Sequence, residues 1–284
     1  MIKKLLVVAF FFFCIFNNLS AQPYVDLLSL QGLQSISNNI ISDNTYDVDV
    51  KWRSAQATMP FQFTDSSAFI LSPGFDRWNL SSGLNIKLST AYLPLTYFKP
   101  LSPHSRIAVV FIPRVNNSDD LRFVKQSWQY GGAVVYTWRK NSTFALKAGL
   151  YYNKEFFGDY FLPLLGIDWK VNSKLYIFGI IPNNFFIDYE LHKYVHFGFA
   201  YKGITTSFRL PVASAPDYFS IEEGQLKLFL DFYLTKKIVI NLEAGQTVAR
   251  NYGTGMLNED PKKIDFNDGS ILKAGLNYRL WVNK

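Results

Sequence analysis

Strict alternation of apolar and polar residues in the C-terminal half limits this chain's fold more than any other feature. A strand with this period has one apolar face and one polar face. In a transmembrane β-barrel, the apolar face meets lipid and the polar face lines the lumen. The last segment alternates between Leu272, Ala274, Leu276, Tyr278, Leu280 and Lys273, Gly275, Asn277, Arg279. The sequence therefore predicts an all-β protein, a transmembrane antiparallel up-and-down β-barrel.

The N-terminus predicts export. Lys3 and Lys4 precede an apolar run from Leu5 to Phe16, and polar or small residues follow up to Ala21. This order is that of a signal peptide of the general secretory pathway, and the run is too short to span a bilayer as a helix. We therefore expect residues 1–21 to be a signal peptide and 22–284 to form one barrel domain. An uncleaved membrane anchor is the alternative.

Composition excludes several classes of protein. Cys14 is the only cysteine and lies within the predicted signal, so the mature chain has no disulfide and no cysteine metal site. The 29 basic and 22 acidic residues are scattered, which makes nucleic acid a poor partner. Aromatic residues make up 17% of the chain, as the aromatic girdles of a membrane barrel require. No cofactor is expected.

The alternation predicts about twelve strands, within a range of about 10–14. The stretch 57–85 is ambiguous, because Phe61, Phe63, Phe69 and Leu71 could form two further strands. We expect strands near 46–56, 86–98, 106–114, 127–138, 143–152, 161–170, 174–181, 185–191, 194–210, 225–234, 237–249 and 270–282.

The predicted connections alternate between long and tight. Residues 115–126, 211–224 and 250–269 are long, whereas Thr235–Lys236 and His192–Lys193 are tight. Outer-membrane barrels have short periplasmic turns and long external loops. A soluble secreted β-protein, the alternative, would show the same strand alternation but has no reason to sort its loops.

Two segments resemble known barrels. Lys273 to Leu280 resembles the C-terminal signal that outer-membrane barrels present to their insertion machinery, although the chain continues to Lys284. Residues 160–210 are similar to a family of uncharacterised outer-membrane β-barrels of Gram-negative bacteria, a domain of unknown function. The shared features are Leu162–Trp169, the Asn172–Ser173 turn, Leu175–Pro182 and Tyr189–Leu191. The resemblance implies this fold and the Gram-negative outer membrane. We expect a monomer with membrane lipid as a partner, and the insertion machinery as a partner of the C-terminal strand. The resemblance implies no activity.

The charged residues on the predicted inner faces are the candidate site. They either form a salt-bridged network that fills the lumen or line a narrow passive channel, and a barrel of this size lies between filled barrels and open porins. The set is Asp47, Asp49, Lys51, Arg53, Lys147, Lys227, Asp231, Glu243, Lys273 and Arg279. We also expect Asp47 or Asp49 of the first strand to pair with Arg279 or Lys273 of the last strand, across the seam where the barrel closes.

An outer-membrane lipid-active enzyme, of phospholipase or deacylase type, is a further alternative. It would need a serine, a histidine and an orienting group near the outer leaflet. The predicted topology places His104, His192 and His196 at the periplasmic end instead, and no lipase motif is present. No catalytic residue is predicted. Asp265 to Gly269 is one residue short of calcium-loop spacing, so no metal site is predicted either.

Overall fold

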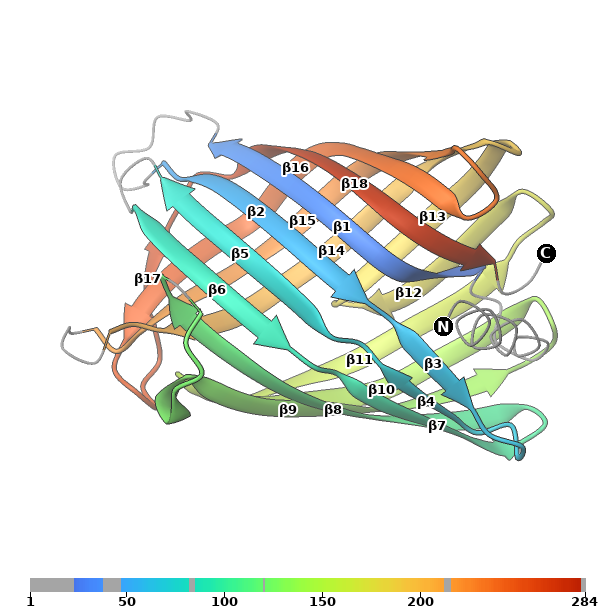
Figure 1. Ribbon diagram of the computed structural model, residues 1–284, viewed down its shortest axis with the longest axis horizontal. Coiled ribbons are helices and arrows are strands. Elements are labelled where there is room, and N and C mark those ends of the chain that lie inside the picture. The colour runs from blue at the N-terminus through green and yellow to red at the C-terminus, as the bar shows by residue number, and fades with distance from the viewer. Residues whose placement is uncertain (1–22, 38–46, 82–84, 120, 212–215, 282–284) are drawn as a thin grey trace, which may run out of the picture.

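The protein is a closed antiparallel β-barrel, seen in a computed structural model that describes residues 23–37, 47–81, 85–119, 121–211 and 216–281 (Figure 1). The predicted signal peptide lies outside the described residues. Those residues form 18 strand segments, which build 14 barrel strands. None of the helices in the described residues is long and apolar enough to cross a membrane.

Eleven barrel strands are continuous or nearly so, and a short segment, β17, pairs only with β16. A single 3-10 turn, η1 (Lys125–Ser127), precedes β9. The strands are β1 (Tyr24–Ser37), β8 (Ser105–Ser118), β9 (Trp128–Arg139), β10 (Phe144–Glu155), β11 (Gly158–Lys170), β12 (Leu175–Ile181), β13 (Asn184–His192), β14 (Val195–Arg209), β15 (Tyr218–Tyr233), β16 (Ile238–Gly255), β17 (Lys262–Asp265) and β18 (Gly269–Trp281).

Three barrel strands are broken into two segments each. Two of the breaks contain Pro73 and Pro94, which cannot donate a ladder hydrogen bond. Their carbonyl oxygens still accept from Ala57 N and Ser72 N, both at 3.0 Å, so the sheet continues past the breaks. The pairs are β2 (Asp49–Ala57) with β3 (Met59–Gln62), β4 (Ala68–Leu71) with β5 (Gly74–Ser81), and β6 (Ile86–Tyr92) with β7 (Leu95–Ser102).

The 14 strands are at the upper end of the predicted range of about 10–14. One of the two additional strands, β4 with β5, lies in the ambiguous stretch 57–85, but the other is β1, where no strand was predicted. In β1 the apolar residues change face: Leu28 and Leu30 point outward, whereas Leu33 points into the barrel. This change of face hides the period of two from the sequence pattern.

The barrel has two different rims. Tyr24 pairs with Trp281 at the end where the described chain begins and ends, which we call the terminal rim. Connections there are tight, such as 193–194 and 234–237, whereas the opposite end, the loop rim, carries 119–127 and 256–268 (Figure 1). The three connections predicted to be long lie at the loop rim, although this rim also has the two-residue turns 156–157 and 182–183.

The outer face carries the predicted apolar band. Leu228 is 55% exposed, and Leu272 and Leu276 are 67% and 47% exposed. Trp128, Tyr130, Tyr136 and Trp138 of β9 are also exposed, at opposite ends of one strand. Such a surface is stable only against lipid, because a soluble protein buries a contiguous apolar area of this kind.

We expect a charge placed in this band to impair the barrel according to its depth. Leu30 and Gln34 share the outer face of β1, and Gln34 is closer to the loop rim. Leu30→Arg should cost about 2–4 kcal/mol of folding free energy, whereas Gln34→Arg should cost about 0–1 kcal/mol. Denaturant unfolding in lipid vesicles measures both values. Equal losses would show that the band is not at bilayer depth.

Candidate functional site: a lumen closed from inside

A short hairpin changes the shape of the barrel wall. Strands β12 and β13 are joined by residues 182–183, and β13 pairs with β14 only as far as Lys202. The rest of β14, from Gly203 to Arg209, has no β13 partner. It leans across the lumen instead, where Arg209 pairs with Asn117 of β8, a strand on the opposite wall. An incomplete wall therefore lets one side of the barrel fold onto the other.

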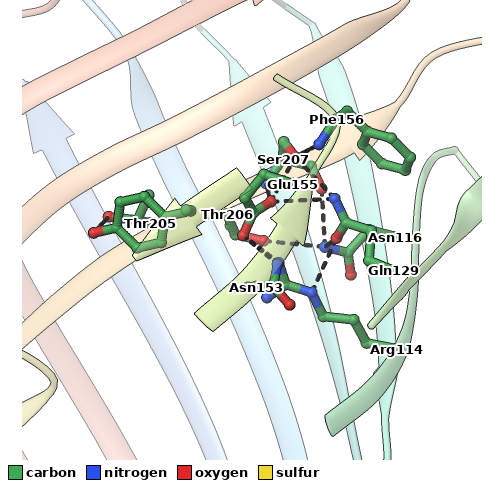
Figure 2. A network of polar contacts seen from close by, with 10 residues as sticks. Arg114, Asn116, Gln129, Asn153, Glu155, Phe156, Thr205, Thr206 and Ser207 are labelled. Atoms are coloured by element: carbon green, nitrogen blue, oxygen red, sulfur yellow. Dashed lines mark hydrogen bonds and ion pairs between the residues drawn. The ribbon is translucent and has the colours of Figure 1, made fainter. Parts of the chain in front are cut away.

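Glu155 of β10 is the centre of a buried hydrogen-bond network at this crossing (Figure 2). Its Oε2 accepts hydrogen bonds from Ser207 Oγ at 2.6 Å, Ser207 N at 3.0 Å and Gln129 Nε2 at 3.1 Å. Its Oε1 accepts from Asn153 Nδ2 at 2.7 Å and forms an ion pair with Arg114. Four strands, β8, β9, β10 and β14, are thereby joined inside the barrel.

This network replaces the missing strand pairing of β14. A buried backbone N–H or C=O without a partner costs free energy comparable to a lost hydrogen bond. Glu155 accepts the backbone N–H of Ser207, and Asn116 Nδ2 donates to the Ser207 carbonyl oxygen at 2.9 Å. Side chains thus satisfy both backbone groups that a neighbouring strand would have bound.

An apolar layer fills the lumen beside the network. Trp52 of β2 and Trp78 of β5 lie 5.8 Å apart between ring centroids and belong to the same buried cluster as Phe208 of β14 and Phe219 of β15. The layer consists of Leu33, Val48, Val50, Trp52, Trp78, Leu80, Leu88, Phe208, Phe219, Ile221, Tyr252, Phe266 and Ile271, all buried. Among the described residues, this layer fills part of the lumen near the loop rim with apolar side chains.

The predicted inner face of segment 46–56 must be corrected. Val48, Val50 and Trp52 point inward, so Lys51 and Arg53 are exposed on the outside and Asp49 is half-buried. The cause is the apolar lumen layer, which makes the inner face of β2 the apolar one. Asp47 is exposed at the loop rim, and its Oδ1 accepts a hydrogen bond from Asn267 Nδ2 at 2.9 Å.

The other six predicted residues lie inside the barrel and form ion pairs. Lys147 contacts Asp168 at 2.7 Å. Glu243 lies 2.8 Å from both Lys227 and Lys273. Asp231 lies 2.5 Å from Arg279, and also accepts a hydrogen bond from Asn241 at 2.7 Å. The pairs of Lys147 and of Glu243 join neighbouring strands, whereas Asp231 of β15 and Arg279 of β18 meet across the intervening β16, an arrangement suited to holding the wall together.

The seam joins β1 to β18, and its ion pair uses a different acid from the predicted one. Asp26 lies directly opposite Arg279, and their side chains are 2.7 Å apart. Asp47 is at the loop rim and Arg279 near the terminal rim, so the predicted pair cannot form. Adding β1 before the predicted first strand reverses that strand's direction, which explains the error.

Side chains also cross the lumen near the terminal rim. Tyr24 of β1 contacts Phe178 of β12 at 5.5 Å between ring centroids, although these strands are not sheet neighbours. Arg279 lies 3.6 Å above the Tyr24 ring. Between the two filled ends, a small internal cavity touches Lys202, Lys227 and Lys273 and measures about 10 Å³. That is room for about one water molecule.

The histidines do not assemble a catalytic triad. His104 and His192 are exposed at the terminal rim. His196 is fully buried, and its Nδ1 lies 2.9 Å from Asp188. Its Nε2 has no hydrogen-bond partner within the described residues. The described residues also contain no cluster of three or more potential metal ligands.

Sequence reasoning missed the residues that close the lumen. Glu155 and Arg114 sit at strand ends or in a predicted loop, and Ser207 has no charge to mark it. Asp26 belongs to the strand that the pattern did not reveal. One signal was available: the predicted strands 174–181 and 185–191 are the two shortest, which indicates a shortened wall there.

Comparison with family models gives one match. The model for a domain of unknown function, DUF6268, matches residues 76–279. The chain belongs to this family. Among curated proteins, none matches. The family match agrees with the predicted resemblance to an uncharacterised barrel family, and it runs from within β5 to within β18.

Solved structures similar to this DUF6268 member are membrane barrels. The NanC porin is 9% identical with a TM-score of 0.42, over 89% of this chain and 100% of that chain. An outer-membrane channel from Pseudomonas putida F1 is 10% identical with a TM-score of 0.47, over 93% and 98%. The translocator domain of the autotransporter NalP from Neisseria meningitidis is 8% identical with a TM-score of 0.43, over 98% and 94%. The fold assignment rests on this chain's own strand pairing.

Proposed function

We propose that this protein is a closed barrel of the Gram-negative outer membrane with a structural or interaction role and no enzyme activity. The observation that carries the proposal is the crossing of β14 over the lumen, fixed by Glu155 and Ser207. A lumen that is filled with apolar side chains next to this crossing cannot conduct hydrated solutes.

Loop lengths support an orientation. The loop rim faces the exterior and the terminal rim faces the periplasm, as in outer-membrane barrels with short periplasmic turns. The chain reaches this membrane through the general secretory pathway after cleavage of residues 1–21. Its last strand, β18, is the part that the insertion machinery binds, and the folded barrel is a monomer surrounded by lipid.

A narrow passive channel is the second candidate. The interior ion pairs around Glu243 favour it, since charged side chains of both signs also line selective pores. A lipid-active enzyme is less well supported, because buried His196 has no hydroxyl group bound at Nε2 within the described residues.

A planar-bilayer recording tests the proposal. The purified barrel should insert without stepwise conductance, because no open path crosses the apolar layer. The same preparation unfolded by heating provides the blank. Steady ohmic steps from the folded protein would overturn the closed-barrel proposal and establish the channel. Release of fatty acid from phospholipid vesicles would establish the enzyme instead.

A further inference from the structure

Basic residues interrupt the apolar outer face on three adjacent strands. Lys51 and Arg53 of β2 are exposed, as is Lys87 of β6, and Arg77 of β5 is half-buried. Arg53 lies opposite Arg77, while Lys51 and Lys87 both lie opposite Asn79. We call these four residues the basic patch. On a face that meets lipid, such a group requires a specific partner, because bare charges are excluded from hydrocarbon.

The patch lies at the edge of the apolar band nearest the loop rim. One step away from that rim, the outward residues in register are Leu30, Ala55 and Phe75, all apolar. Barrel strands tilt, and β6 extends further toward the loop rim than β2 and β5 do (Figure 1). In the orientation proposed above, the patch is level with the head groups of the outer leaflet.

Three of the four patch cations, all except Arg77, have no acidic partner within the described residues. Within the part of the chain that the structure describes, neither Lys51, Arg53 nor Lys87 forms an ion pair. The only outward acid on β2 is Asp49, at the rim-side end of the strand opposite Ser81. The lysines and arginine at this height are therefore available to phosphate, which arginine binds through two parallel hydrogen bonds.

An apolar groove begins beside the patch. It measures about 740 Å³, and both Lys51 and Arg53 line it. Small outward residues form its floor, where Gly32 lies opposite Ala274 and Ala244 lies opposite Leu272. Its other lining residues include Leu228, Leu230 and Leu242 of the neighbouring strands. Cations at one edge and a hydrocarbon-lined depression below them match the two ends of an anionic lipid.

We propose that this face binds one molecule of lipid A, the phosphorylated, multiply acylated lipid of the outer leaflet. Its phosphates contact Lys51, Arg53 and Lys87, and one acyl chain lies in the groove over Gly32. The patch spans three strands, roughly 10 Å at the usual strand spacing. A head group with more than one phosphate fits this width better than a single phosphodiester. The inference rests on the proposed orientation of the barrel.

Charge removal provides the first arm of the test. The detergent-purified barrel is titrated with lipid A, and native mass spectrometry counts the lipids bound. The triple variant Lys51→Gln, Arg53→Gln, Lys87→Gln should bind lipid A at least about tenfold more weakly, since each lost phosphate contact removes a charge-assisted hydrogen bond. The matched control, Lys140→Gln, Lys193→Gln, Lys236→Gln, removes three lysines exposed at the terminal rim and should bind like the wild type. An equal loss in the control would overturn the site.

Filling the groove provides the second arm. No atom lies within 4 Å of a Cβ added at Gly32, so Gly32→Leu should fold normally and occupy the groove. It should weaken lipid A binding about tenfold, whereas Gly32→Ala should leave binding nearly unchanged. Unchanged binding in the leucine variant would overturn the groove assignment, and phosphatidylglycerol binding as tight as lipid A would overturn the ligand. Because binding is measured in detergent, its failure is distinct from a conducting lumen.

Discussion

Replacing Glu155 with alanine should lower the free energy of unfolding by about 3–5 kcal/mol, because the change leaves the mostly buried Arg114, whose side chain is 11% exposed, without its ion-pair partner. It also leaves the backbone N–H of Ser207 unsatisfied on a strand that has no β13 neighbour there. The segment of β14 that crosses the lumen should then detach. Denaturant unfolding in vesicles measures the stability, and planar bilayers should show conductance steps that the wild type lacks.

Two control variants make this result specific. Glu222→Ala removes a carboxylate whose partner Lys263 is 3.2 Å away, with about half of each side chain exposed. It should cost less than about 1 kcal/mol, as exposed pairs do. Glu155→Gln keeps the size but not the charge, so its loss should be intermediate. A stable, non-conducting Glu155→Ala barrel would mean that the apolar layer alone closes the lumen.

Replacing Arg279 with methionine should have an effect of similar size. Arg279 contacts Asp26 across the seam at 2.7 Å and Asp231 at 2.5 Å, so both carboxylates lose their cation. An uncompensated buried charge costs about 3–5 kcal/mol. Adding Asp231→Asn to the variant should recover part of the loss, because the buried charge is then removed as well. Unfolding of the four proteins of this double-mutant cycle gives the coupling energy.

The same measurement tests the corrected first strand. Asp47→Asn should show no coupling to Arg279, because the two residues lie at opposite rims. Lys154→Met, which breaks a solvent-exposed pair with Asp159, should leave stability unchanged. Coupling between Asp47 and Arg279 would restore the seam as predicted from the sequence and would contradict the register of β1 with β18.

The sequence predicts the wall of this barrel better than its interior. Leu226, Leu228 and Leu230 alternate regularly because they meet lipid, which selects only for apolar character. The same regularity fails wherever the lumen is apolar: Val48, Val50 and Trp52 look like a lipid face but pack inside. An alternation with a period of two predicts that a strand has two different faces, but it does not show which face points into the barrel. That choice depends on what fills the lumen, and here an apolar layer makes the apolar face of β2 the inner one.

The ion pairs also divide into those that the strand pattern predicts and those that it does not. Lys227, Glu243 and Lys273 lie on long, regular strands, and their inward direction followed from the pattern. Glu155 depends instead on β14 arriving from the opposite wall, a contact between positions 52 residues apart. No local pattern encodes a contact of that kind. It follows only from the short β12–β13 hairpin, whose effect on the wall is three-dimensional.

The hairpin of β12 and β13 uncouples the number of strands in this barrel from the width of its lumen. In barrels with a complete wall, the number of strands sets the circumference, and the circumference sets the bore. Here the wall is notched on one side, so the perimeter near the loop rim is shorter than the strand number implies. Insertions or deletions in this single hairpin are therefore a route by which related barrels can widen or narrow without gaining or losing a strand.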